Sequence, residues 1–421
     1  MDTNENLKCY MVVVKITGRC NINCTYCYMY NLGDNSYLKL PKKMSEKTVV
    51  EMMNRVREHC IENGINRYVF SLHGGEPLLA GQDFFRMIVA KANEILMPEV
   101  TPSFSVQTNG MMINEEWCKT LAELDFDIGI SLDGTKEAHD MYRLDFKGNG
   151  TYDDVIKGLK IAQESEHLIR KPGVLCVLNI DSDPVEIYNQ FKMLGITSID
   201  ILLPDYTYDN PPPAKHYENS DHPYADWLIK MFDVWFKEND GRLRVRIFEF
   251  ITGLILGNDI SFDHLGSEKN ELLVIETDGE IEAVDVLKAC GDGFTKAGAN
   301  VATHSFNDAM QTDLAKMYHY SHIKVAKKCL ACPVKEVCGG GYIPHRYSSK
   351  NGFNNPSVYC NDLLKLITHI QNTVINELPE EFIKEMEVEK ITYHEALQMI
   401  EDEMLQMEEP DYAIELESFK K

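Results

Sequence analysis

The chain has 421 residues, which predicts two or three domains and enough material for a hydrophobic core. Hydrophobic residues make up 44% of the sequence and charged residues 26%, a globular composition that excludes global disorder. Acidic residues outnumber basic ones by 66 to 42, a net charge of −24, so nucleic acid is excluded as a partner over most of the surface.

No apolar run approaches the roughly 20 residues that span a bilayer, and the polar start of the chain is not a secretory signal. We therefore expect a cytoplasmic protein with no membrane partner. Because a cytoplasmic chain keeps its thiols reduced, disulfides do not explain its 12 cysteines, and metal sites become the leading explanation. The clustered cysteines are Cys20, Cys24 and Cys27, and then Cys329, Cys332, Cys338 and Cys360.

Residues 10–205 alternate short β-branched or apolar runs with helical patterns such as Glu46–Asn63 and Asp83–Ile95. This alternation predicts repeated β-α units around a parallel sheet. The six expected strands are Tyr10–Ile16, Tyr68–Leu72, Ser103–Gln107, Ile128–Leu132, Val174–Asn179 and Ser198–Leu203. Six strands indicate an α/β fold of the partial (β/α)6, TIM-like barrel type, in which function lies in the loops after the strands.

A connector follows the barrel, because Asn-Pro-Pro-Pro within Asp209–Lys215 excludes regular structure. The next expected elements are an amphipathic helix around Trp227–Phe236 and a hairpin at 272–285, turned at Asp278-Gly279. Few regular signals and many cysteines come after the hairpin, as expected of a small domain folded around metal.

The last stretch of the chain, 361–421, is acidic and helical in pattern, with Pro379 and Pro410 as breaks. We interpret its charge as a solvated helical face, and docking of a basic peptide is the alternative. The expected domains are 1–208 for the barrel, 209–271 for the connector and helix, 272–370 for the metal domain and 371–421 for the acidic helical tail.

Three cysteines, Cys20, Cys24 and Cys27, lie on one short loop directly after the first expected strand. Three thiolates hold three irons of a cubane cluster and leave the fourth iron open, and an open metal position is a chemical site. A zinc site completed from elsewhere and ordinary core cysteines are the alternatives.

This loop, with Tyr26 immediately before its third cysteine, resembles the signature of radical S-adenosylmethionine (SAM) enzymes. Segments after the next three expected strands are also similar to that family: Gly74-Gly75-Glu76-Pro77, Gln107-Thr108-Asn109-Gly110 and Ser131-Leu132-Asp133-Gly134. The resemblance implies that a [4Fe-4S] cluster on the three cysteines binds SAM and that one electron splits SAM into methionine and a 5′-deoxyadenosyl radical.

The resemblance also implies particular SAM contacts. The segment at Gly74–Glu76 is expected to hold the amino group, and Arg143 is expected to face the carboxylate. Tyr26 is expected to lie against the cofactor and Leu203 to touch adenine. The full set of implied cofactor-binding residues is Tyr26, Gly74, Gly75, Glu76, Gln107, Asn109, Ser131, Arg143 and Leu203.

Four later cysteines are enough to close a cluster completely, which suits electron transfer or structure, with a structural zinc site as the alternative. With the glycines at 339–341, this region resembles the SPASM domain, the auxiliary-cluster domain of peptide-modifying radical SAM enzymes such as sulfatase maturases. Two cysteines of the SPASM pattern are replaced here by Val284 and Tyr342. The resemblance therefore implies one auxiliary [4Fe-4S] cluster, held by Cys329, Cys332, Cys338 and Cys360.

Two aspartates are the candidate catalytic acid-base residues. Asp285 matches the aspartate proposed as base in sulfatase maturases, and a local hydrogen bond within the hairpin is its alternative role. Asp205 follows the sixth expected strand, where a barrel places substrate-facing groups, and it equally suits a cap on the connector.

The stretch from Cys338 to Cys360 resembles the maturases that form three-residue cyclophanes in ribosomal peptides. Those enzymes join an aromatic ring carbon to the β-carbon of a residue two positions on. The resemblance implies abstraction of a β-hydrogen, attack on the ring, and loss of one electron and one proton. It also implies two partners, a ribosomal precursor peptide and a reduced electron donor such as ferredoxin or flavodoxin. His345 and Arg346 are expected to be solvated, and contact with the substrate is the alternative.

Two alternatives to cyclophane formation stay open. The first is another peptide modification on the same scaffold: oxidation to formylglycine as in sulfatase maturases, thioether formation or epimerisation. The second is a non-catalytic iron-sulfur or zinc scaffold protein. The first expected strand begins near the start of the chain, so we expect the barrel rim, the connector or an outside partner to recognise the peptide leader.

Overall fold

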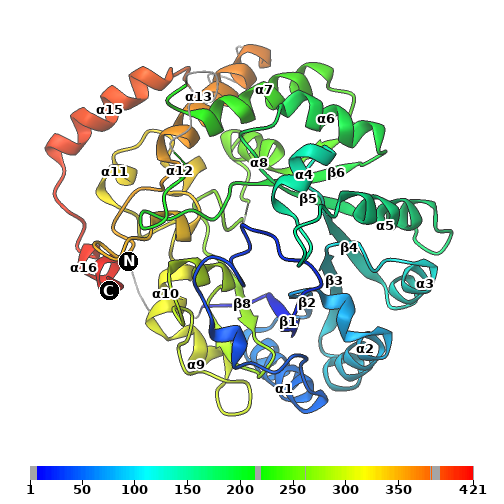
Figure 1. Cartoon of the computed structure of the whole chain (residues 1–421). Coiled ribbons are helices and arrows are strands. Elements are labelled where there is room, and N and C mark those ends of the chain that lie inside the picture. The colour runs from blue at the N-terminus through cyan, green and yellow to red at the C-terminus, as the bar shows by residue number, and fades with distance from the viewer. Residues whose placement is uncertain (1–6, 214–219, 261, 380, 382–388, 421) are drawn as a thin grey trace. The chain divides into compact units, whose positions relative to one another are not determined.

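The computed structural model describes residues 7–213, 220–260, 262–379, 381 and 389–420 (Figure 1). Lys215, at the end of the expected connector, lies outside the described residues. The chain divides into two compact units, the first made of 1–176 with 271–319 and the second of 177–270 with 320–421. This division by contacts does not follow the four expected segments, and their assignment as functional domains stays a prediction.

The first unit is built on a largely parallel sheet. Its strands are β1 (Met11–Thr17), β2 (Arg67–Gly74), β3 (Thr101–Thr108), β4 (Phe126–Ser131), β5 (Gly173–Val177, whose last residue crosses the division), β8 (Leu272–Ile275) and β9 (Ile281–Glu282). The order of these strands is β5-β4-β3-β2-β1-β8-β9. Neighbours pair in parallel except β8 and β9, which form an antiparallel hairpin.

Helices alternate with these strands, and Figure 1 shows α1, α2, α3 and α5 along the outer side of the sheet. The helices are α1 (Glu46–Asn63), α2 (Gln82–Leu96), α3 (Glu115–Glu123), α4 (Lys136–Tyr142), α5 (Tyr152–Glu164), α9 (Phe306–Met310) and α10 (Asp313–His319), with 3-10 turns η1 (Ser36–Leu38), η2 (Pro77–Ala80) and η4 (Asp285–Cys290). Polar caps define the helix starts: the side chain of Ser45 accepts from Thr48 N, and that of Asn114 accepts from Trp117 N.

The core of this unit contains a row of packed aromatic rings that runs across three strands and continues onto a helix. Phe70 of β2 and Phe104 of β3 have ring centroids 5.4 Å apart, and Phe104 and Phe126 of β4 are 5.3 Å apart. Phe85 of α2 lies 5.3 Å from Phe126. Each buried aromatic ring contributes about 2 to 3 kcal/mol of transfer free energy. The contacts between the rings therefore stabilise the packing of β2, β3, β4 and α2, and the carboxyl ends of the strands lead into the loops.

The second unit is mainly helical. Its elements are α6 (Pro184–Met193), β6 (Ser198–Leu202), α7 (Pro223–Glu238), β7 (Arg244–Val245), α8 (Arg246–Ile255), α11 (Lys327–Leu330), α12 (Lys335–Cys338), η5 (Ile343–Arg346), α13 (Cys360–Glu377), α15 (Tyr393–Gln406) and α16 (Ala413–Glu417). Strands β6 and β7 pair in parallel, and the amide of Leu178, just after β5, donates to Leu202 O of β6 at 2.8 Å.

The expected α/β fold is confirmed, since each of the six expected strands lies within two residues of an observed one at both ends. The described part of the tail contains the end of α13 and the helices α15 and α16. One difference concerns the hairpin. Strand β8 pairs with β1, from Met11 opposite Leu272 to Val14 opposite Ile275, so the hairpin extends the sheet of the first unit.

Within the described residues, no helix is both long enough and apolar enough to cross a membrane.

Candidate active site

The cysteine loop after β1 is tied to the residues on either side of Arg143. Asn23 N donates to Leu144 O at 2.7 Å, and Thr25 N donates to Tyr142 O at 2.9 Å. These two bonds bracket Arg143, so the loop that carries the thiols and the residue expected to face a carboxylate are fastened together. The terminal amide of Asn31 closes the loop by donating to Cys24 O at 2.7 Å.

The three thiols of this loop are neighbours. Burial, and to a smaller extent the nearby Cys24 and Cys20 thiols, raise the pKa of Cys27 to about 12. Burial likewise raises the pKa of Cys20 to about 11. Without metal these groups are therefore thiols at neutral pH, and a bound cationic cluster would displace their protons, as metal binding to cysteine requires. The donor set fits the three-thiolate site that the sequence predicts.

Arg143 is buried, with 7% of its surface exposed, and its guanidinium is only partly satisfied. Its Nη1 donates to the Tyr26 hydroxyl at 2.9 Å, and that hydroxyl donates to Asp133 Oδ2 at 2.5 Å. Arg143 Nε has no partner. Because a buried charged donor without an acceptor costs free energy, this N–H fits an anionic group such as the SAM carboxylate. Asp133 is a participant that the sequence interpretation did not assign.

Glu76 is fully buried, and its carboxylate joins the loops after β2 and β3. Oε1 accepts from Leu78 N at 3.0 Å and from Thr108 Oγ1 at 2.7 Å, and Oε2 accepts from Asn109 N at 2.8 Å. These bonds hold the carboxylate within the protein. Glu76 therefore positions the two loops that are expected to contact SAM.

The glycines before Glu76 allow a close approach of backbone to backbone. A Cβ at Gly75 would lie 2.2 Å from Arg19 O and 2.4 Å from the Tyr30 hydroxyl. At Gly74, where φ is +138°, it would lie 2.2 Å from Thr17 O. The glycines thus bring the loop after β2 against the segment that leads from β1 into the cysteine loop.

Replacing Gly75 with alanine is expected to lower the free energy of unfolding by about 1 to 3 kcal/mol, because the added methyl has no room beside the Arg19 carbonyl. Thermal or urea unfolding of the metal-free protein measures this. Gly64→Ala is the matched control, since its φ of +67° is strained but nothing lies within 4 Å of the new Cβ. A Gly75→Ala protein that is as stable as wild type would contradict the tight contact.

Gln107 and Ser131, two of the residues expected to bind SAM, contact each other. Gln107 Nε2, at the end of β3, donates to Ser131 Oγ, at the end of β4, at 2.9 Å. Asn109 lies on the loop after β3, and its Nδ2 donates to Asn21 Oδ1 at 2.7 Å. Since Asn21 follows Cys20 directly, Asn109 joins the expected SAM-binding loops to the cysteine loop.

Asp285 begins η4, and its carboxylate is buried with Lys15 and Tyr28. The Tyr28 hydroxyl donates to Asp285 Oδ2 at 2.6 Å, and Lys15 forms an ion pair with the same oxygen. Burial alone would raise the pKa of Asp285, but the ammonium groups of Lys15 and Lys288 lower it more, and the net pKa lies well below its usual value. Burial lowers the pKa of the nearby His73 to about 3, so this imidazole is neutral.

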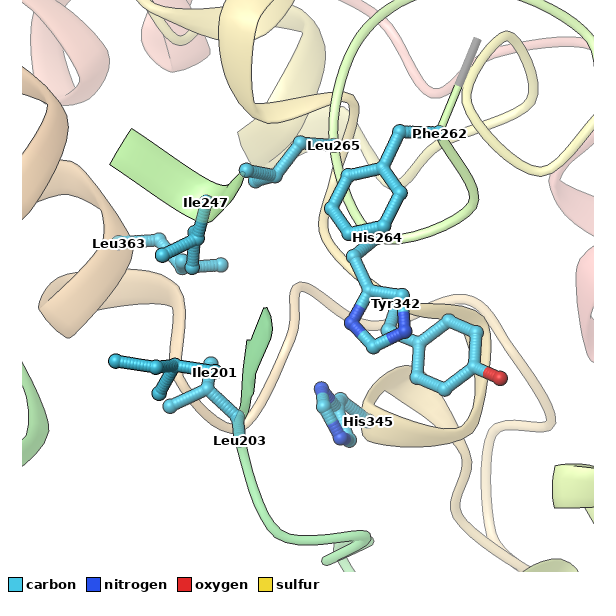
Figure 2. Close-up of a pocket in the computed structure, with 9 residues that line it drawn as sticks. All are labelled: Ile201, Leu203, Ile247, Phe262, His264, Leu265, Tyr342, His345 and Leu363. Carbon is cyan, nitrogen blue, oxygen red and sulfur yellow. The ribbon is translucent and has the colours of Figure 1, made fainter. Parts of the chain in front are cut away.

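The remaining expected residues lie in the second unit. Leu203 follows β6 and lines a pocket with Ile201, Tyr342 and His345 (Figure 2). The His264 ring stacks on that of Tyr342, with centroids 3.9 Å apart and planes 12° apart. An aromatic stack thus occupies position 342, where the SPASM pattern has a cysteine. Asp205 is partly buried two residues beyond Leu203.

The expectation that His345 and Arg346 are solvated is wrong: their side chains are 1% and 0% exposed. The segment before Cys360 covers them. Val358 N donates to His345 O at 2.8 Å, and Asn355 Nδ2 donates to Arg346 O at 2.9 Å. Their burial is difficult to predict from the sequence, because a His-Arg pair after a glycine-rich turn usually lies on the surface.

The four later thiols lie together in the second unit: Cys329 on α11, Cys338 on α12, Cys360 at the start of α13, and Cys332 in the turn between α11 and α12. Burial raises the pKa of Cys338 well above its usual value, and Cys329, Cys332 and Cys360 raise it further. Each of these cysteines is therefore close enough to the others for their charges to interact. In the part of the chain that the structure describes, no three His, Cys, Asp or Glu side chains are arranged to hold a single metal ion.

Residues 14–181 match the family model described as the Radical SAM superfamily. The chain therefore contains a radical SAM domain and is a radical SAM enzyme, as predicted. The cofactors of this domain are a [4Fe-4S] cluster and SAM.

Curated relatives extend the similarity beyond that domain. The cysteine-type anaerobic sulfatase-maturating enzyme of Clostridium novyi is 28% identical over 361 residues, which are 83% of this chain and 92% of the relative. The serine-type enzyme of Bacteroides thetaiotaomicron is 21% identical over 377 residues, covering 86% of this chain and 89% of the relative. The similarity to sulfatase-maturating enzymes thus extends well beyond the radical SAM domain.

Solved structures share the fold. Native anSMEcpe with bound AdoMet matches with a TM-score of 0.75 and 24% identity, covering 87% of this chain and 98% of that one. Streptococcus suis SuiB bound to the precursor peptide SuiA matches with a TM-score of 0.54 and 16% identity, covering 80% of this chain and 73% of that one. The fold is therefore one that also occurs in radical SAM structures determined with a peptide.

Proposed function

We propose that this enzyme is a maturase that acts on a ribosomally made precursor peptide and forms a carbon-carbon bond between a side-chain β-carbon and an aromatic ring, a cyclophane. The observation that carries the proposal is the aromatic stack of Tyr342 on His264, where the pattern of sulfatase maturases has a cysteine ligand. With Val284 at the other replaced position, the chain departs from a standard sulfatase maturase at both places.

In this proposal Cys20, Cys24 and Cys27 hold the cluster that binds SAM. When bound, SAM supplies the 5′-deoxyadenosyl radical that removes a hydrogen atom from the peptide. The unpartnered Nε of Arg143 receives the SAM carboxylate, and Tyr26 and Asp133 hold the guanidinium in place. Glu76 and Asn109 position the surrounding loops. Leu203 remains the proposed contact of adenine.

Crosslinking requires an electron acceptor and a proton acceptor. The β-carbon radical adds to the ring, and the adduct then loses one electron and one proton to restore aromaticity. The auxiliary cluster on Cys329, Cys332, Cys338 and Cys360 is proposed to take the electron. Asp285 is proposed to take the proton, with Asp205 as the alternative. A carboxylate whose pKa is as low as that of Asp285 is a weak base, which suffices for a strongly acidic oxidised ring adduct.

Oxidation of a cysteine or serine side chain to formylglycine is the second candidate. The curated relatives favour it, because both cysteine-type and serine-type sulfatase-maturating enzymes are similar to this chain over most of its length. It also starts at a β-carbon and releases one electron and one proton. Its first proton leaves a thiol or hydroxyl, which needs a stronger base than the one that the contacts of Asp285 provide.

Mass spectrometry of a candidate precursor peptide before and after incubation with the enzyme distinguishes these reactions. A crosslink removes two hydrogens and suppresses backbone fragmentation between the joined residues. Oxidation of serine also removes two hydrogens but creates an aldehyde, so a hydrazide reagent must label it. Oxidation of cysteine to formylglycine removes two hydrogens and also replaces sulfur by oxygen, and epimerisation leaves the mass unchanged. A hydrazide-reactive product would overturn the crosslink and establish the second candidate.

Asp285→Asn is expected to lower peptide modification by about a hundredfold or more, the usual contribution of an acid-base residue, while 5′-deoxyadenosine still forms. The reason is that the amide takes no proton, whereas the contacts of SAM are unchanged. Liquid chromatography of both products from one reaction measures the ratio. Asp205→Asn is the matched comparison: if it uncouples the two products and Asp285→Asn does not, the roles of the aspartates are reversed.

A reduced ferredoxin or flavodoxin is the proposed electron donor. The barrel rim, the connector or an outside partner is proposed to recognise the peptide leader. A cytoplasmic location remains part of the same proposal.

A further inference from the structure

Arg346 is a buried cation with little to bind it inside the protein. Its side chain is fully buried in η5, and only Nη1 has a protein acceptor, Lys324 O at 3.5 Å. Nε and Nη2 have no partner. Among the ion pairs of the described residues, none includes Arg346. A buried guanidinium is costly unless an anion accompanies it, so the surroundings of this group should supply negative charge.

The guanidinium lies between the two chain segments that carry three of the later cysteines. A Cβ at Gly340, two residues after Cys338, would lie 3.2 Å from Nη1. On the other side, Lys324 O belongs to the segment that leads into α11 and Cys329. The polar contact of this side chain with Lys324 O and its approach to Gly340 thus both come from segments that border the cysteine cluster.

The electrostatic interactions of Arg346 point the same way. Burial lowers the pKa of its guanidinium to about 10, and the Cys329 and Cys338 thiols act against this by raising it. Arg346 is therefore charged at neutral pH. The Tyr412 hydroxyl also raises this pKa, so the groups near the guanidinium that can carry negative charge are Cys329, Cys338 and Tyr412. Binding of a cluster would turn the two thiols into thiolates.

We propose that Arg346 is the counter-charge of the auxiliary cluster and raises its reduction potential, which makes the cluster a better electron acceptor. This inference rests on the proposed function, in which the four thiolates hold that cluster. One-electron reduction adds a negative charge to the cluster, and a nearby cation buried in a medium of low polarity stabilises the reduced state more than the oxidised one. The electron comes from the peptide radical adduct, which is thereby oxidised, and Arg346 neither gains nor loses a proton.

The test is a redox titration of the full-length protein in which Cys20, Cys24 and Cys27 are alanine, so that only the later cluster contributes. Electron paramagnetic resonance follows its reduction. Arg346→Gln is expected to lower the midpoint potential by about 59 mV or more, a tenfold change in the reduction equilibrium. Arg346→Lys keeps the positive charge, so its midpoint potential is expected to stay close to that of the parent protein.

An unchanged potential in Arg346→Gln with its iron intact overturns the proposal, as does an equal shift in Arg346→Lys. Loss of iron from the glutamine variant alone supports it, because the charge is then needed to hold the cluster. Loss of iron from both variants overturns it, since shape rather than charge would be decisive. If the later site of the parent protein contains zinc or no metal, there is no auxiliary cluster and the proposal is overturned. None of these outcomes depends on which peptide product forms, so a failed peptide assay is a separate result.

Discussion

Replacing Cys20, Cys24 and Cys27 together with alanine is expected to reduce SAM cleavage to background and to halve the iron content. The reconstituted wild-type protein should contain about eight irons, and the triple variant about four, because the later cluster remains. The loop carries all three ligands and is fastened to the Arg143 segment, so the variant loses both the electron source and the metal to which SAM binds. Iron and sulfide analysis with chromatography of 5′-deoxyadenosine measures both effects.

Cys118→Ala is the matched control for this prediction, since Cys118 is a buried thiol on α3, outside both cysteine groups. It should keep about eight irons and the cleavage activity. About four irons in the wild type would leave the later site without a cluster, and about twelve would reveal a further cluster despite the replaced cysteines. Continued cleavage of SAM by the triple variant would contradict the role of the loop.

Replacing Arg143 with glutamine is expected to weaken SAM binding by about tenfold to a hundredfold, the value of one charged hydrogen bond lost from a buried site. The reason is the unpartnered Nε, which is a donor that the protein itself does not use. Calorimetric titration of SAM into the anaerobically reconstituted enzyme measures the affinity. The iron content should be unchanged, since Arg143 supplies no ligand.

Two further variants separate charge from positioning at this site. Arg143→Lys keeps the charge but loses the planar fork, so it should bind SAM with intermediate affinity. Tyr26→Phe removes the hydroxyl that links Arg143 to Asp133 and should weaken binding less than Arg143→Gln. Equal affinity of wild type and Arg143→Gln would contradict the assignment of the carboxylate contact.

The strands were predictable because buried parallel strands appear in a sequence as short apolar runs between helical patterns. The run Leu272–Ile275 shows the limit of this signal. Its apolar pattern and the turn at Asp278-Gly279 predict a hairpin, but nothing local indicates that β8 also pairs with β1, more than 250 residues earlier. Pairing between distant strands depends on the tertiary packing, which a local pattern does not contain.

The ligand-bearing loops were predictable because cysteine spacing is a chemical requirement, whereas their supporting contacts were not. The link from Arg143 through Tyr26 to Asp133 joins three segments that are distant in sequence. A buried partner for Lys15 could have been predicted, because it is a single lysine within an otherwise apolar strand. The structure shows that this partner is Asp285. A buried lysine usually has such a partner, so this position was open to inference.

The contacts of Glu76 within the protein and the burial of Arg346 could not be obtained from local sequence. A carboxylate after two glycines suggests a ligand for an ammonium group, yet that of Glu76 is engaged by Leu78, Thr108 and Asn109 within the protein. Arg346 follows a glycine-rich turn, a surface pattern, and is nevertheless fully buried. In both cases the sequence identifies a polar group correctly, and the surrounding fold determines what it binds.

Transfer of deuterium from the peptide to the cofactor product tests the central claim most directly. The precursor peptide, deuterated at its side-chain β-carbons, is incubated with reduced enzyme and SAM, and the 5′-deoxyadenosine is analysed by mass spectrometry. We predict that it carries one deuterium and that the peptide becomes lighter in the same proportion. Unlabelled 5′-deoxyadenosine formed alongside a modified peptide would contradict hydrogen abstraction from a β-carbon.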